Sequence, residues 1–284
     1  MAIMTIPHNP TYTGLLDLKV NIPFLEVDGE TLCLQLIKPQ WASGDGKGFP
    51  LVVFIQGSAW TKPNQFWELP QLSQLAAKGF VIASVTHRSC FEAAAPAFLQ
   101  DVKAAIRFLR KNAAEYDIDK TRVCAFGTSS GGNTALLLGL TGDDPAFETA
   151  EHAGESTAVQ AVVDCFGPAD LVRMTERWKD FPLSDDNLIY ALGGRNPETY
   201  RDTLATISPV NYVTPGRTLP PFLLLHGDAD TVVAYSDSER MYQLLTANGY
   251  QADLVRVTDA PHEGSFWSQP LLEIIFGFIL RHLS

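Results

Sequence analysis

The sequence has few positive charges and no cysteine pattern suited to metal binding. Lysine and arginine number 21 against 32 aspartates and glutamates, which gives a net charge of −11. A surface this acidic repels phosphate backbones, so no nucleic-acid partner is expected. The cysteines Cys33, Cys90, Cys124 and Cys165 lie far apart, without a CxxC pair or a histidine at ligand spacing. We therefore expect free thiols, the last two buried in apolar strands, and no metal site.

Long apolar runs are also missing. No stretch approaches the roughly 20 consecutive apolar residues that a membrane-spanning helix needs, so no membrane association is expected. The opening stretch, MAIMTIPHNP, contains neither the basic segment nor the apolar core of a secretory signal. These features favour a cytoplasmic protein. The sequence carries no signal for an oligomeric state.

The chain instead shows short buried strands alternating with amphipathic helices over 284 residues, 46% of which are hydrophobic. A hairpin with its turn at Asp28–Gly29 comes first, and six apolar runs predicted as buried strands follow. Helical patterns separate these runs, the clearest over residues 98–116. This alternation predicts an α/β fold, with a mostly parallel central sheet flanked by helices, as one domain over residues 1–284. Sites in such sheets lie at the carboxyl ends of the strands.

Residues 169–212 interrupt the alternation. The segment separates the fourth and fifth of the six buried strands and is longer than an ordinary connection. It contains the aromatic residues Trp178, Phe181 and Tyr190. We expect short helices that form a small cap inserted into the domain.

The stretch AFGTSSGGN, residues 125–133, contains a candidate nucleophile between a predicted strand and a predicted helix. A nucleophilic serine in such a sharp turn has small residues two positions before and after it. Centring this pattern on Ser129 gives two glycines, whereas centring it on Ser130 gives a β-branched threonine at the first crowded position. Ser129 is therefore the predicted nucleophile, and the Ser130 N–H at the helix start is a candidate oxyanion donor.

A serine nucleophile needs a base and an acid, which follow it in the order acid then histidine in hydrolases of this type. His262 lies between the last predicted strand and the last helix, where a base belongs, whereas His226 ends a strand and is predicted to be structural. Asp228 and Asp230 both follow that strand. Asp228 directly after the terminal glycine suits a turn cap, so Asp230 is the preferred acid.

The stretch FIQGSAW after the first of the six buried strands supplies candidate backbone donors for an oxyanion. Small residues there let the main chain approach a substrate closely, and the N–H groups of Ser58 and Ala59 are assigned to the hole with that of Ser130. Trp60 follows directly. It is expected either to form a wall of the substrate pocket or to anchor the core.

Together these residues resemble the α/β-hydrolase superfamily, and more closely its bacterial esterase branch that includes feruloyl and acetyl esterases and is related to hormone-sensitive-lipase-like enzymes. Residues 101–139 resemble this branch throughout, as do VQAVVDCFGPADL, SPVNYVTP and PPFLLLHGDADTVVAYSDSERMYQLLTANG. The resemblance covers most of residues 50–283. In the branch the acid matches the second aspartate of HGDAD, which is Asp230 here.

Two positions depart from the pattern of the branch. Its oxyanion loop usually contains HGGAW, whereas this chain has QGSAW, with Gln56 and Ser58 at the changed positions. The branch often has Tyr-Arg where this chain has His87-Arg88. The resemblance implies that Arg88 pairs with Asp101 to brace the oxyanion loop.

These residues predict a serine carboxylesterase that hydrolyses small-acyl or aryl esters, such as acetyl, short-chain or hydroxycinnamoyl esters, through an acyl-enzyme. The expected substrate is a small-molecule or carbohydrate-linked ester, and no cofactor is needed. The stretch WELPQL and the residues Trp178, Phe266 and Trp267 suggest a pocket with an aromatic rim. Two alternatives stay open: an amide hydrolase, such as an arylformamidase or a peptidase, and a non-catalytic ligand-binding protein on the same scaffold.

Overall fold

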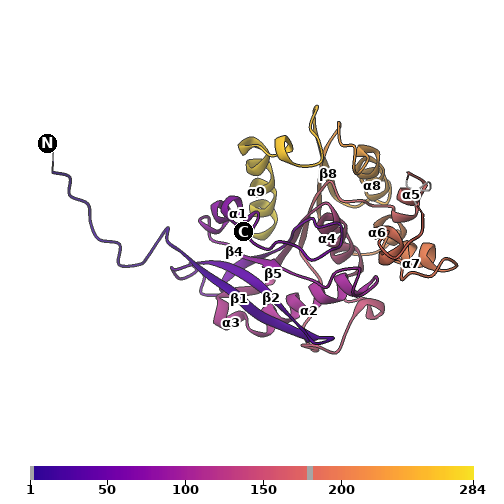
Figure 1. Cartoon of the computed structure of the whole chain (residues 1–284). Coiled ribbons are helices and arrows are strands. Elements are labelled where there is room, and N and C mark those ends of the chain that lie inside the picture. Colours follow the sequence, from indigo (N-terminus) through magenta and orange to yellow (C-terminus); the bar gives the residue numbers. More distant parts are fainter. Residues whose placement is uncertain (1–2, 178–181) are drawn as a thin grey trace.

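The described residues form one sheet of eight strands. The structure is a computed structural model that describes residues 3–177 and 182–284 (Figure 1). The strands are β1 (Leu16–Val27), β2 (Glu30–Pro39), β3 (Phe49–Ile55), β4 (Val81–Val85), β5 (Ile118–Thr128), β6 (Ala161–Cys165), β7 (Phe222–Gly227) and β8 (Ala252–Val257). They correspond to the predicted hairpin and the six predicted apolar runs, so the α/β architecture is confirmed.

The order of strands across the sheet is β1-β2-β4-β3-β5-β6-β7-β8. The pairs β1–β2 and β2–β4 are antiparallel, and every other neighbouring pair is parallel. The carboxyl ends of β3, β5, β7 and β8 therefore meet at the same edge of the sheet. The loops that carry the predicted site residues begin at this edge.

Helices cover both faces of the sheet. They are α1 (Leu69–Ala76), α2 (Ala97–Lys111), α3 (Ala113–Tyr116), α4 (Ser130–Thr141), α8 (Tyr235–Ala247), α9 (Gln269–Leu283) and the short 3-10 turns η1 (Pro145–Phe147) and η3 (Gly264–Phe266). Apolar residues of α1 and α9 share one buried cluster with Val52 and Phe54 of β3. Those of α2, α4 and α8 share the other with Leu51 and Val53. Strand β3 is buried on both faces, which explains its unbroken apolar sequence.

The helix predicted over residues 98–116 is divided into α2 and α3 at Asn112. The Asn112 side-chain amide donates to the Phe108 carbonyl oxygen at 2.8 Å and so caps the last turn of α2. Short polar side chains compete with helical hydrogen bonds in this way. An apolar pattern that runs past the break does not reveal it.

Three cationic side chains of α2 are buried, although amphipathic helices usually turn such residues to water. Lys103, Arg107 and Arg110 are 0%, 1% and 5% exposed. The first two form ion pairs with Glu148, and Arg110 donates to main-chain carbonyls of residues 156 and 158. The segment after α4 therefore packs over this face of α2.

The segment between β6 and β7 contains short helices, as predicted for residues 169–212. They are α5 (Leu171–Arg177), α6 (Leu188–Leu192), α7 (Tyr200–Thr206) and the 3-10 turn η2 (Pro209–Tyr212). Both α5 and α6 contact α7, and η2 contacts α4. The segment is tied to the loop before α2, because the Ala95 N–H donates to the Leu192 carbonyl oxygen at 2.9 Å. Its function as a cap stays a prediction, and Trp178 and Phe181 lie outside the described residues.

The segment before β1 extends away from the sheet and the helices (Figure 1). Across residues 3–177 and 182–284, we find no helix with the length and apolar character needed to cross a bilayer. Cys124 on β5 and Cys165 on β6 are fully buried free thiols, as predicted.

Candidate active site

Ser129 lies in a sharp turn between β5 and α4. Its backbone adopts φ 52° and ψ −123°, a left-handed φ that is unusual for a residue other than glycine. A Cβ added to Gly127 would lie 2.0 Å from the Gly131 carbonyl oxygen, and one added to Gly131 would lie 2.0 Å from the Ile55 carbonyl oxygen. Glycine is therefore required at the two flanking positions that identified Ser129 in the sequence. The turn holds the serine at the carboxyl edge of the sheet.

The structure brings Ser129, His262 and Asp230 together from three separate loops. The His262 Nε2 atom lies 2.9 Å from the Ser129 Oγ atom, and its Nδ1 atom lies 2.6 Å from Asp230 Oδ2. The imidazole remains 17% exposed, whereas the Asp230 side chain is fully buried. These distances suit an imidazole that takes a proton from the hydroxyl while the carboxylate holds the other nitrogen.

Asp230 accepts hydrogen bonds through both carboxylate oxygens. Its Oδ1 atom receives the N–H groups of Val232 and Val233, and Oδ2 receives His262 and His226. Burial would raise the pKa of Asp230, but these hydrogen bonds and the charge of His262 lower it well below its usual range. The carboxylate therefore stays ionised at neutral pH.

Asp228, the other candidate acid, points elsewhere. It accepts from Arg256 Nε at 2.7 Å and from the Asp259 N–H at 2.6 Å, and these hydrogen bonds lower its pKa. The preference for Asp230 thus agrees with the geometry, and Asp228 closes the turn. His226 is fully buried, as its strand-terminal position predicted, but it contacts Asp230, which the sequence did not indicate.

The oxyanion loop differs from the prediction at Ser58. The Ser58 N–H donates to the Ser130 Oγ atom at 2.9 Å, so the structure does not leave it free for a substrate oxygen. Among the described residues, neither the Ala59 N–H nor the Ser130 N–H has a hydrogen-bond acceptor. Ala59 adopts a left-handed φ of 51°, which turns the loop at this point. Two of the three predicted donors are thus free, and the Ser130 side chain anchors the third.

Arg88 and Asp101 form the predicted ion pair. Arg88 donates to Asp101 through its Nε, Nη2 and main-chain N atoms at distances of 3.0, 2.8 and 2.9 Å. Asp101 is buried, so this pair fixes the loop after β4. In that loop the Cys90 N–H donates to the Trp60 carbonyl oxygen at 2.9 Å, which connects the pair to the oxyanion loop.

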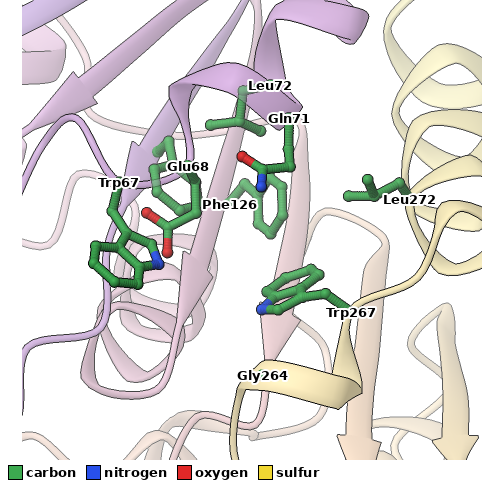
Figure 2. Close-up of a pocket in the computed structure, with 9 residues that line it drawn as sticks. Trp67, Glu68, Gln71, Leu72, Phe126, Gly264, Trp267 and Leu272 are labelled. Carbon is green, nitrogen blue, oxygen red and sulfur yellow. The ribbon is translucent and has the colours of Figure 1, made fainter.

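A cavity of about 190 Å³ lies between the start of α1 and the loop that follows His262 (Figure 2). Figure 2 shows the Trp67 and Glu68 side chains on one side and Trp267 on the other. The lining residues are Phe54, Trp67, Glu68, Gln71, Leu72, Phe126, Gly264, Trp267 and Leu272. Four residues of the stretch WELPQL and Trp267 thus line this cavity, and its role as the substrate pocket stays a prediction.

Two predicted pocket residues belong to the core instead. Trp60 is 2% exposed and its ring centroid lies 6.4 Å from that of Phe98. Phe266 is fully buried, with its ring centroid 4.8 Å from that of Phe166. Both alternatives for Trp60 were compatible with its sequence position, and the contact with Phe98 favours the core. Trp178 lies outside the described residues.

Two carboxyl groups, Glu68 in the cavity wall and Glu263 next to the lining residue Gly264, were not identified from the sequence. Burial and the nearby charge of Glu263 raise the pKa of Glu68 to about 8, and burial also raises the pKa of Glu263. Glu68 Oε2 is buried without a hydrogen-bond partner in the described protein, whereas Glu263 Oε2 accepts from the Trp267 indole N–H at 2.8 Å. Glu263 directly follows His262, but no sequence pattern relates it to Glu68.

The histidines, cysteines and carboxylates of residues 3–177 and 182–284 form no group of three or more that could hold a metal ion. The expectation that no cofactor is needed stays a prediction.

Known proteins resemble this chain over most of its length. The BD-FAE family model matches residues 34–245. The esterase LipC of Mycobacterium tuberculosis is 32% identical over 204 residues, which cover 71% of this chain and 49% of LipC. LipQ of the same organism is 28% identical over 68% of this chain and 45% of its own length. The chain therefore spans about half the length of these curated relatives.

Solved structures match the fold more completely. A structure described as a truncated form of a carbohydrate esterase from gut microbiota has a TM-score of 0.79 and 28% identity, with 96% of this chain and 98% of that chain covered. A thermophilic esterase from Thermogutta terrifontis has a TM-score of 0.75 and 24% identity, with 96% and 92% covered, and supports the fold alone. Because the family model spans most of the chain and LipC matches over two thirds of it, this protein belongs to the BD-FAE family.

Proposed function

We propose that this protein hydrolyses carboxylic esters through an acyl-enzyme formed on Ser129. The observation that carries the proposal is the unbroken chain of hydrogen bonds from Ser129 Oγ to His262 at 2.9 Å and from His262 to Asp230 at 2.6 Å. A serine hydroxyl becomes an effective nucleophile only when a neighbouring base removes its proton. The names of the esterase relatives agree with this chemistry.

The residues act in a defined order. His262 Nε2 takes the Ser129 proton as Oγ attacks the ester carbonyl, and the N–H groups of Ala59 and Ser130 receive the developing oxyanion. Asp230 stays ionised and stabilises the imidazolium. His262 then gives its proton to the leaving alcohol oxygen as the carbon–oxygen bond breaks. A water molecule repeats the sequence on the acyl-enzyme, which releases the acid and restores Ser129.

The cavity between α1 and the loop after His262 supports a short acyl chain or a single aromatic ring as the bound part of the ester. Its volume of about 190 Å³ is below the roughly 300–1,000 Å³ of pockets for drug-sized ligands. Tryptophan and phenylalanine side chains suit flat, apolar groups. One matched structure is described as a carbohydrate esterase, so acetylated carbohydrates belong among the candidate substrates.

The central test compares the wild type with Ser129→Ala on p-nitrophenyl esters of rising chain length, methyl ferulate and acetylated xylan. Loss of Ser129 is expected to lower kcat by at least about 10³-fold and to abolish labelling by a fluorophosphonate. A folded Ser129→Ala variant that keeps its activity would refute the nucleophile. Faster cleavage of a matched anilide than of the ester would indicate an amide hydrolase instead.

Replacement of Trp67 tests the assignment of the cavity. Trp67→Ala is expected to raise KM for aryl esters by roughly tenfold, because it removes one aromatic wall, while acetyl esters change little. Tyr12→Ala provides a matched control, since it removes an exposed aromatic residue from the segment before β1. Equal effects on both ester classes would contradict the assignment.

A further inference from the structure

Asp230 is held by two histidines rather than one. Its Oδ2 atom lies 2.6 Å from His262 Nδ1 and 3.1 Å from His226 Nε2. The side chains of Asp230 and His226 are both fully buried. His226 therefore shares with His262 the oxygen through which Asp230 acts.

The neighbours of His226 determine where its proton lies. Its Nε2 atom is 3.1 Å from Asp230 Oδ2 and also 3.1 Å from the Val233 carbonyl oxygen, and both of these atoms only accept hydrogen bonds. Nε2 must therefore carry the hydrogen. On the other side, Nδ1 lies 2.7 Å from the Ser238 Oγ atom in the first turn of α8, and this hydroxyl can donate to it. A neutral imidazole satisfies all of these contacts.

We infer that His226 is a positioning residue that fixes Asp230 and limits how strongly this carboxylate stabilises the His262 imidazolium. The inference rests on the proposed function. An N–H donor on Oδ2 takes up part of the carboxylate charge, so His262 releases its proton more readily to the leaving alcohol.

The remaining neighbours of His226 are two aromatic rings and a carboxyl group. The rings of Phe166 and Tyr235 lie 6.4 and 5.9 Å from the imidazole, measured between centroids. Asp237 on α8 interacts electrostatically with His226, and its own pKa is raised by burial. No further cation in the described residues contacts the imidazole, so Ser238, Val233 and Asp230 determine its tautomer.

The experiment compares pH profiles of kcat/KM for His226→Leu, His226→Gln and Ser238→Ala. His226→Leu removes the donor on Oδ2, so kcat should fall by about tenfold and the acid limb of the profile should move to higher pH. His226→Gln places an amide N–H near the position of Nε2 and should restore the wild-type limb. Ser238→Ala should move the limb in the same direction by a smaller amount. His152→Leu is the matched control: it removes another histidine with a main-chain contact, the Phe24 carbonyl oxygen at 2.7 Å.

The outcomes separate the inference from the proposed function. If wild-type protein neither cleaves esters nor reacts with a fluorophosphonate, the proposed function fails. If the wild type is active and His226→Leu loses stability while its pH profile stays unchanged, His226 is only structural and the inference fails. Where His226→Leu does not fold, an acid limb of Ser238→Ala that stays at the wild-type position overturns it. A Gln variant that matches Leu in activity and profile also overturns it.

Discussion

Ser130 supplies two different groups to the site. Its N–H at the start of α4 is free to meet an oxyanion, and its Oγ accepts the Ser58 N–H at 2.9 Å. The serine-glycine stretch revealed the first contribution, because helix starts present unpaired N–H groups. The second depends on how the loop after β3 folds over the turn, so it became visible only in the structure.

Ser130→Ala is therefore expected to reduce activity without abolishing it. The free N–H remains, but the loop loses a hydrogen bond whose net value is about 1 kcal/mol, which corresponds to roughly a fivefold decrease in kcat. Steady-state kinetics on an acetyl ester, with fluorophosphonate labelling of Ser129 as a check on the nucleophile, measure the effect. Complete loss of labelling would show that Ser130 itself is the nucleophile.

Asp164 is a buried carboxyl group beneath the same turn. It is fully buried, its Oδ1 accepts the Gly167 N–H at 2.9 Å, and burial raises its pKa well above the usual value. The folded protein thus keeps this proton at pH values where the unfolded chain, with a pKa of about 3.9, has lost it. Because the unfolded state binds fewer protons at this position, the contribution of Asp164 to stability falls as pH rises above about 4.

Asp164→Asn removes a group that resists ionisation, so it should raise the melting temperature at about pH 7 more than at about pH 4. Thermal unfolding followed by circular dichroism at both pH values measures the difference. The control is Asp17→Asn, which changes an aspartate in the half-exposed outer strand β1. An Asn variant that is equally destabilised at both pH values would show that Asp164 is ionised in the folded protein.

Helix α1 contributes one wall of the cavity, and the N-cap residue Glu68 just before it determines how that cavity responds to pH. Glu68, with a pKa of about 8, is uncharged at lower pH and ionises beside Glu263 as pH rises. The added charge opposes burial of an apolar group. We therefore expect KM for a butyrate ester to increase by roughly threefold between about pH 7 and pH 9.

Glu68→Gln should remove that increase, since the amide does not titrate. Glu115→Gln on α3 is the matched control, because it changes an exposed glutamate outside the cavity. The measurement is KM of the wild type and both variants across this pH range, corrected for spontaneous hydrolysis of the ester. If Glu68→Gln shows the wild-type increase, another group causes it.

Helix α2 depends on its buried cations. Arg107 forms an ion pair with Glu148 and also donates to the Glu151 carbonyl oxygen at 2.8 Å. Arg107→Ala removes the donor to the Glu151 carbonyl oxygen and one of the two ion-pair partners of Glu148, which keeps Lys103, so it should lower the free energy of unfolding by about 2 kcal/mol. Urea unfolding provides the measurement, with Lys111→Ala at the exposed end of α2 as control. Catalysis below the unfolding transition should change little, and equal stabilities of the two variants would contradict the prediction.

At the scale of the whole molecule, the parallel sheet was predictable because its central strands contain short apolar runs, although the outer strand β8 has no fully buried residue. The positions of Ser129, Asp230 and His262 followed from the requirement that loops at one edge of the sheet meet. The glycines around Ser129 identified the turn, since any side chain there would collide with main-chain atoms. At these residues the sequence motif and the strand topology predicted the same position in the fold.

The unpredicted features all depend on contacts between distant segments. Ser58 bonds to a serine 72 positions away, and Arg107 is buried by a loop more than 40 positions further along. Glu68 and Glu263 influence each other only because α1 lies next to the loop after β8. A single sequence shows which residues are polar, but it does not show which distant loop packs over them in the folded protein.

The net charge of −11 produces a negative electrostatic field around the protein, which disfavours anionic esters relative to neutral ones. An anionic ester approaches against this field, and salt screens the repulsion. The kcat/KM for p-nitrophenyl hemisuccinate should increase by roughly threefold between about 10 and 150 mM ionic strength. The acetate ester, which is neutral, should be insensitive to salt. A decrease for the hemisuccinate would point to a local positive field at the site.

Ser129 and its base lie 133 positions apart, and the base follows β8 at the edge of the sheet. During translation at about 5–20 residues per second, the nucleophile would precede its activating histidine by roughly 7 to 27 seconds. A nascent chain would therefore carry an inert serine until β8 had joined β7. Hydrolysis could begin only after this last strand was in place, so the appearance of turnover would report completion of the sheet.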